Sequence, residues 1–230
     1  MKNKRNVLKD RGIRTLMAAA GLFVCSAGTY CQMQASLGMS PWEALNQGLA
    51  LQFHTTYGAA CIAVALLVVA VDLLLKEKIG IGTLLDAVLV GSFVDMWVVG
   101  KFVPVPASLP GKLCLLFAGS VIICFGQALY MKAGLCCGPR DALMVGIGKK
   151  VSRVPIGFVN ISILAAVLAL CIPLKSPIGL GTVICAFGNG IVMEGVFRLV
   201  HFKPRQVIHE SIAQTFREIF MGYRLNVTKL

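Results

Sequence analysis

Charged residues are scarce in this chain. Asp, Glu, Lys and Arg make up 14% of its 230 residues, whereas soluble domains contain about a quarter. Hydrophobic residues make up 57%, and the mean hydropathy is +0.80. A soluble domain of this length does not carry so much apolar surface. The scarcity of charge therefore excludes a soluble protein and indicates a polytopic membrane protein.

Histidine is also rare, and no group of residues has the spacing of a catalytic or metal site. Only three histidines occur. The Cys136–Cys137 pair, with Met131 nearby, is of a type that binds soft metals, but no His or Cys cluster completes a site. The nine cysteines show no disulfide framework and are expected to serve packing. We predict no enzymatic activity, no metal and no cofactor.

What the chain does contain is a series of long, nearly uncharged runs. Each can cross a hydrocarbon core of about 30 Å, which takes about 20 helical residues. The sequence therefore predicts an all-α polytopic protein with six transmembrane helices in a lipid bilayer. The runs are 13–35, 56–75, 82–100, 113–131, 155–173 and 179–199.

Basic residues exceed acidic ones, 22 against 10. The aromatic and basic interleaving typical of single-strand nucleic-acid binders is missing, so we expect no nucleic-acid partner. Lys and Arg are expected to set the orientation in the membrane. Segment 1–12 is predicted to be a cytosolic N-terminus before a retained first span. Segment 201–230 is predicted to be a basic cytosolic tail, either an amphipathic surface helix or an irregular segment.

Two twelve-residue stretches in the chain follow one pattern. LGMSPWEALNQG occupies 37–48 and LCCGPRDALMVG occupies 135–146. Aligning 16–48 with 114–146 gives ten identities in thirty-three positions. Chance matches between apolar stretches do not place Pro, Gly and acidic positions in register.

The match continues after one inserted residue. IGIGT at 79–83 then pairs with IGLGT at 178–182. The chain is therefore an internal duplication, with membrane repeats at 13–100 and 112–200 and an external loop at 101–111. Further pairs are Gly58 with Gly157, Gly91 with Gly190, and Asp95 with Glu194.

Each repeat contains a short helix that begins at a proline. The two helices, Pro41–Phe53 and Pro139–Lys150, would each cover roughly 20 Å, which is too little to cross the bilayer. Each repeat then has three crossings, and the second repeat is inverted relative to the first. Seven basic loop residues fall inside and three outside, whereas eight crossings would split them five and five. The inner residues are Lys76, Lys78, Lys132, Arg140, Lys149, Lys150 and Arg153, and the outer ones are Lys101, Lys112 and Lys175.

The openings of these short helices predict the functional site. Helices broken inside a bilayer are found where they line a cavity, and paired broken helices in inverted repeats mark a transporter's central site. Glu43 and Asp141 are expected to face each other and bind a cation or a proton. Alternatively they cap their own helices, with Glu43 and Ser40 forming a capping box. The residues at the openings are Ser40, Pro41, Gly138 and Pro139.

The binding candidates also include Arg140, Asn46 and Gln47, and the secondary candidates are Asp86, Asp95 and Glu194. Arg140 could receive an anionic group, pair with Asp141, or lie at the inner surface. Asn46 and Gln47 are further binding candidates, although interhelical hydrogen bonding is the commoner use of such residues. This second use also applies to Asn160 and Asn189.

Asp86 and Asp95 lie nine residues apart and point to opposite sides of a straight helix. They cannot both face one cavity. Asp95 and its equivalent Glu194 have either a shared structural or coupling role or, like Asp72, a position near a span end among lipid headgroups. Thr83 and Thr182, in the Gly-x-Gly-Thr turns, are expected to cap the helices that follow.

The motifs GMSPWEALNQGL and IGIGTLLDAVLVGSFVD resemble those of the YczE/YitT-type family of small bacterial integral membrane proteins. The resemblance covers most of residues 13–200. It implies a multi-pass protein of a bacterial cytoplasmic membrane. It supplies no substrate and no catalytic residues.

These observations predict a small secondary transporter of an unidentified solute or ion, with its site between the repeats and both termini cytosolic. Coupling to protons is one form of this prediction, and a homodimer is one expected assembly. The alternative is a membrane scaffold that binds another protein through its basic tail. A channel is a third possibility.

Overall fold

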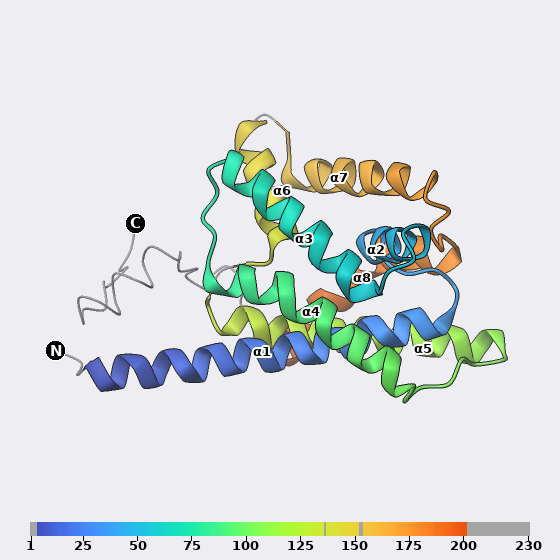
Figure 1. Cartoon of the computed structure of the whole chain (residues 1–230), viewed down its shortest axis with the longest axis horizontal. Coiled ribbons are helices and arrows are strands. Elements are labelled where there is room, and N and C mark those ends of the chain that lie inside the picture. Colours follow the sequence, from blue (N-terminus) through green and yellow to red (C-terminus); the bar gives the residue numbers. More distant parts are fainter. Residues whose placement is uncertain (1–3, 136, 152–153, 202–230) are drawn as a thin grey trace.

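The computed structural model describes residues 4–135, 137–151 and 154–201. All regular elements in these ranges are α-helices (Figure 1). They are α1 (Lys4–Ala35), α2 (Pro41–Gln52), α3 (Tyr57–Leu74), α4 (Ile81–Gly100), α5 (Leu109–Lys132), α6 (Pro139–Lys150), α7 (Ile156–Cys171) and α8 (Leu180–Leu199).

Each predicted apolar run corresponds to one of the six longer helices. Five of these, α1, α3, α4, α5 and α8, are long and apolar enough to cross a membrane. The apolar α7 has 16 residues and covers about 24 Å. Helix α1 extends to Lys4, so the basic N-terminal segment is helical from that residue onward. The predicted tail, 201–230, lies outside the described residues beyond His201.

The short helices begin where the sequence places them, at Pro41 and Pro139. Ser40 is the N-cap of α2, with extended backbone (φ −60°, ψ 155°), and proline fits the first helical position because its missing N–H needs no partner there. The Ser40 side chain makes no capping hydrogen bond, so the predicted capping box with Glu43 is wrong. The reason is tertiary: the Glu43 carboxylate binds a residue of the other repeat, as described below.

Helix α1 packs most extensively against α5, alongside it in Figure 1. A Cβ atom placed on Gly21 would lie 2.8 Å from the carbonyl oxygen of Gly126, and one on Gly28 would lie 2.6 Å from that of Gly119. Only glycine permits so close a backbone approach. The alignment pairs Gly21 with Gly119 and Gly28 with Gly126, so the two contacts exchange under the duplication.

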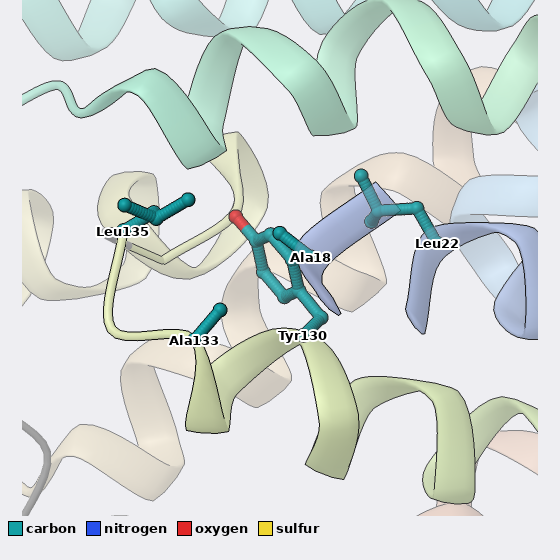
Figure 2. Packing of buried hydrophobic residues seen from close by; sticks show 5 residues of the cluster. All are labelled: Ala18, Leu22, Tyr130, Ala133 and Leu135. Atoms are coloured by element: carbon teal, nitrogen blue, oxygen red, sulfur yellow. The ribbon is translucent and has the colours of Figure 1, made fainter. Parts of the chain in front are cut away.

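A buried cluster lies at one end of this α1–α5 crossing. Figure 2 shows the Tyr130 ring of α5 among Ala18 and Leu22 of α1 and the nearby Ala133 and Leu135. All five are at most 5% exposed. Because lipid tails are as apolar as these side chains, their contribution is close packing rather than removal of apolar surface from water. The cluster holds the chain that leads from α5 into α6.

The loops before the short helices are each hydrogen-bonded to the other repeat. The Gly82 N–H of α4 donates to the Leu135 carbonyl (2.9 Å), and the Gly181 N–H of α8 donates to the Leu37 carbonyl (2.7 Å). The alignment pairs Gly82 with Gly181 and Leu37 with Leu135. These two bonds are therefore also equivalent under the duplication.

The threonines of the Gly-x-Gly-Thr turns cap their helices, as predicted. Thr83 Oγ1 accepts a hydrogen bond from the Gly80 N–H, and Thr182 Oγ1 accepts one from the Gly179 N–H, both at 3.2 Å. Thr83 Oγ1 also donates to the Cys137 carbonyl at 2.7 Å. The start of α4 is thereby tied to the residues that open α6.

Candidate functional site

The N-termini of the two short helices meet through an ion pair. The Arg140 guanidinium of α6 donates to the Glu43 carboxylate of α2 at 2.5 Å. The same guanidinium lies over the Trp42 ring, 5.3 Å from its centroid, a cation–π geometry. Trp42 and Arg140 are equivalent positions in the two repeats. The first turns of the two short helices therefore contact each other across the repeat boundary.

This arrangement corrects two expectations for Arg140. Its ion-pair partner is Glu43 rather than its neighbour Asp141, and it does not lie in an inner loop. Its side chain is one-third exposed, toward the cavities described below. In the six-crossing arrangement expected from the sequence, the basic residues of the inner loops would therefore number six rather than seven, against three outside.

A first cavity of about 130 Å³ lies beside the ion pair. Helices α1 to α6 all contribute to its lining. Its charged residues are Glu43, Asp86, Arg140 and Asp141. Among the described residues, neither Asp86 nor Asp141 has a hydrogen-bond or ion-pair partner. Asp86 lies over the opening of α6, where a Cβ on Gly138 would be 2.7 Å from its Oδ2 atom.

A second cavity of about 330 Å³ adjoins the first and extends between α7 and α8. It shares Glu43, Arg140 and Asp141 with the first cavity. Asn160 of α7 and Asn189 of α8 line it, together with apolar side chains. The ion pair therefore stands between two spaces, and Asp141 lines both.

The linings of the two cavities correspond under the duplication. Residues of α3 and α4 that line the first cavity are equivalent to residues of α7 and α8 that line the second. The equivalent pairs are Cys61 with Asn160, Ala65 with Leu164, Asp86 with Cys185, and Val90 with Asn189. The two spaces are thus counterparts that differ in volume and in polar groups.

The remaining predicted binding residues lie away from the ion pair. Asn46 is fully buried in α2, and neither it nor Gln47 lines either cavity. Asp95 faces α3, where it accepts a hydrogen bond from the Gly58 N–H at 2.8 Å. Asp86 and Asp95 point to different surroundings, as their spacing predicts.

Two other acidic residues differ in exposure. Asp72 is fully buried, so its expected place among lipid headgroups is wrong. Glu194 is two-thirds exposed and binds Arg198 one turn along α8, at 2.6 Å. Hydropathy alone could not separate these cases, because both residues lie within apolar helices.

Two residues of the site, Trp42 and Gln127, are not among those predicted from the sequence. Trp42 stacks on Arg140, and Gln127 lines both cavities. The alignment held a signal for each, since Trp42 is the equivalent of Arg140, and Gln127 is the equivalent of Thr29, which lines the first cavity.

The lining of the first cavity contains more acidic than basic residues. Three carboxylates and one guanidinium line the first cavity. Glu43 and Arg140 compensate each other, which leaves Asp86 and Asp141. A carboxylate removed from water is costly without a counter-charge or a proton. In the described part of the chain, no three His, Cys, Asp or Glu residues are arranged to hold a metal ion.

Six of the described cysteines are buried between the packed helices α1, α3, α5, α7 and α8. They are Cys25, Cys31, Cys61, Cys124, Cys171 and Cys185. Cys114 is exposed and Cys137 is partly exposed, and all eight described cysteines are free thiols. Cys136 lies outside the described residues.

Comparison with known proteins shows the family. Residues 12–198 match the family of unknown function DUF6198. The uncharacterized membrane protein YczE of Bacillus subtilis is 31% identical over 176 residues, covering 76% of this chain and 80% of YczE. An uncharacterized Haemophilus influenzae protein is 32% identical over 170 residues, covering 74% of this chain and 77% of that protein.

A further relative from Bacillus subtilis, the uncharacterized protein YyaS, is 32% identical over 187 residues, covering 79% of this chain and 92% of YyaS. No solved structure matches the chain. The family match spans both repeats and the site between them. The chain is therefore a helical membrane protein that belongs to the YczE-type family, DUF6198.

Proposed function

We propose that this protein is a small secondary transporter with one central site between two inverted three-span repeats. The observation that carries the proposal is the meeting of two half-helix N-termini, from equivalent segments, in a polar cavity. Paired broken helices of this kind form the substrate sites of transporters with inverted repeats. The proposal assigns no catalytic role to any residue.

Contacts that exchange under the duplication support the inverted arrangement. The α1–α5 glycine contacts form one such set, and the Gly82–Leu135 and Gly181–Leu37 hydrogen bonds form another. A two-fold axis in the membrane plane relates such contacts when each repeat crosses an odd number of times. In this arrangement both termini are cytosolic, and the membrane is a bacterial cytoplasmic membrane.

The solute is a small cation or a solute with a cationic group, and a proton is the natural coupling ion. Asp86 and Asp141 line the first cavity beside Arg140, whose ion-pair partner is Glu43. A cation or a proton bound there removes the cost of an isolated charge at membrane depth. The cavity volumes of about 130 and 330 Å³ suit a small solute.

The test is untargeted metabolite profiling of cells that lack the gene, complemented with either the wild-type chain or Asp86→Asn. At least one small cationic compound should change in the deletion strain and return with the wild type but not with Asp86→Asn. Equal complementation by both chains would contradict a site at Asp86.

The scaffold alternative predicts the reverse dependence. A chain truncated after Leu199 would lose the basic tail and its partner, whereas Asp86→Asn would retain function. The transporter proposal expects the truncated chain to restore the metabolite profile, provided that it reaches the membrane in normal amounts by immunoblot.

A further inference from the structure

Helices α3 and α4 of the first repeat are sealed together by close backbone packing. A Cβ atom on Gly58 would lie 2.5 Å from the Gly91 carbonyl oxygen, and one on Gly91 would lie 2.6 Å from that of Gly58. The Gly58 N–H lies in the first turn of α3, where an amide has no acceptor within its own helix. It donates to Asp95 Oδ1 at 2.8 Å. Gly58, Gly91 and the Asp95 carboxylate thus hold α3 and α4 in direct contact.

The second repeat has the same residue types at the equivalent positions but not the contact. A Cβ atom placed on Gly157 or Gly190 would have no described atom within 4 Å, apart from the adjacent backbone of its own helix. Glu194, the equivalent of Asp95, binds Arg198 and is two-thirds exposed. Gly190 lines the second cavity, which extends between α7 and α8.

The missing α7–α8 contact is an exception, because other contacts of one repeat have an equivalent contact in the other repeat. The Cβ position of Gly146 lies 2.8 Å from Cγ of Glu77, and that of the equivalent Gly48 lies against Ser176, the equivalent of Glu77. The α1–α5 glycine contacts and the loop hydrogen bonds behave in the same way. The second repeat still has the residue types that this contact needs, because Gly157 and Gly190 are glycines and Glu194 has a carboxylate. A change of sequence therefore does not explain why α7 and α8 are not in contact there.

We propose that α7 and α8 form the open entrance to the site in this structure, and that Gly157, Gly190 and Glu194 form its closing contact in a second state. As α7 closes on α8, Glu194 leaves Arg198 and accepts a hydrogen bond from the Gly157 N–H. The α3–α4 contact at Gly58, Gly91 and Asp95 opens in the same transition. This inference rests on the proposed function, of which it gives the access mechanism.

The exchange costs little because one set of contacts replaces a similar set, and the Glu194–Arg198 pair that opens is exposed to solvent, where ion pairs are weak. Two packings of similar free energy are both populated, and a bound solute shifts the balance between them. With a cytosolic N-terminus, α7 starts and α8 ends on the cytosolic side, so the open entrance faces the cytosol. The first cavity, behind the sealed α3–α4 contact, is the smaller of the two.

Spin-label distances test the proposal without a known solute. One label pair replaces Phe158 and Ile191, both exposed, on α7 and α8. The matched pair replaces their equivalents, the exposed Ala59 and Ser92, on α3 and α4. In a chain without native cysteines, reconstituted in lipid, the Phe158–Ile191 pair should show a long distance and a shorter one. The shorter distance should equal the main distance of the Ala59–Ser92 pair.

Single substitutions should shift the population of the short Phe158–Ile191 distance. One should lower it, and two should raise it. Gly157→Ala should remove the short Phe158–Ile191 distance, because its Cβ blocks closure but fits the present state. Gly58→Ala should raise that short population, because its Cβ clashes with the Gly91 carbonyl. Asp95→Asn removes the carboxylate charge that caps α3 and should act in the same direction without a steric conflict. Gly195→Ala, another open position on α8, is the control and should leave both distributions unchanged.

One fixed Phe158–Ile191 distance in the wild type and in all variants would overturn the proposed entrance. If carboxylate variants such as Asp86→Asn still abolished solute movement, the transport function would stand while the entrance failed. If the distances exchanged as expected but Asp86→Asn complemented fully in metabolite profiling, the entrance would stand and the cation site would fail.

Discussion

Arg140 and Glu43 lie 97 positions apart in the chain, yet the guanidinium of one binds the carboxylate of the other at 2.5 Å. Each belongs to the first turn of a short helix that begins at proline. Because the partners come from different repeats, neither repeat completes this ion pair alone. The pair therefore joins the halves of the molecule at the place where the cavities meet.

Loss of one partner of this pair should destabilise the protein. Glu43→Gln leaves the Arg140 guanidinium without its carboxylate partner. Because the pair is partly exposed, the loss should lie between the roughly 1 kcal/mol of an exposed pair and the roughly 3–5 kcal/mol of a fully buried one. The double variant Glu43→Gln/Arg140→Gln should recover more than half of that loss, because no single charge is left behind. Thermal unfolding in detergent measures both effects. A Glu43→Gln protein as stable as the wild type would contradict the role of the pair in joining the repeats.

Neutralisation of the unpaired carboxylates should behave differently. Asp86→Asn and Asp141→Asn remove charges that have no partner among the described residues, so stability should change by less than about 1 kcal/mol. Uptake into proteoliposomes of the compound that metabolite profiling identifies should be abolished in both. The exposed Lys175→Gln serves as the charge control and should transport normally. Normal uptake by both aspartate variants would remove these residues from the site.

Alanine at the α1–α5 crossing should be costly at both equivalent positions. A Cβ on Gly21 or Gly28 would lie 2.8 Å or less from an opposing carbonyl oxygen, and overpacking costs about 1–3 kcal/mol. Gly195→Ala meets no described atom within 4 Å and should be neutral or stabilising by up to about 1 kcal/mol, from helix propensity. Unfolding temperatures of the three variants compare these costs directly. Losses at only one of Gly21 and Gly28 would contradict an equivalent pair of contacts.

Much of the fold could be predicted from local signals in the sequence. Pro41 and Pro139 mark the starts of the short helices, since proline fits the first helical position and interrupts a longer helix. Thr83 and Thr182 mark the caps of α4 and α8. The gathering of the half-helix openings could be expected from the duplication, because equivalent broken helices lie about one axis.

The partners of the polar side chains could not be predicted in this way. Glu43 has the spacing of a capping box with Ser40, but Arg140 from the other repeat takes its carboxylate. The burial of Asp72 depends on the helices around it, which hydropathy does not report. The lack of contact between Gly157 and Gly190 could not be predicted from the sequence either, because the same residue types are in close contact at Gly58 and Gly91. Tertiary contacts decide all three features.

Inversion of the repeats is the central claim, and Lys76 and Lys175 test it most directly. They are equivalent positions in the duplication, both exposed and both in the left-handed backbone region (φ 62° and 49°). Each is replaced by cysteine in a chain without native cysteines, and intact cells are treated with an impermeant maleimide. The account predicts that Lys175→Cys reacts from outside, whereas Lys76→Cys reacts only after the membrane is permeabilised. Reaction of both positions from the same side would contradict it.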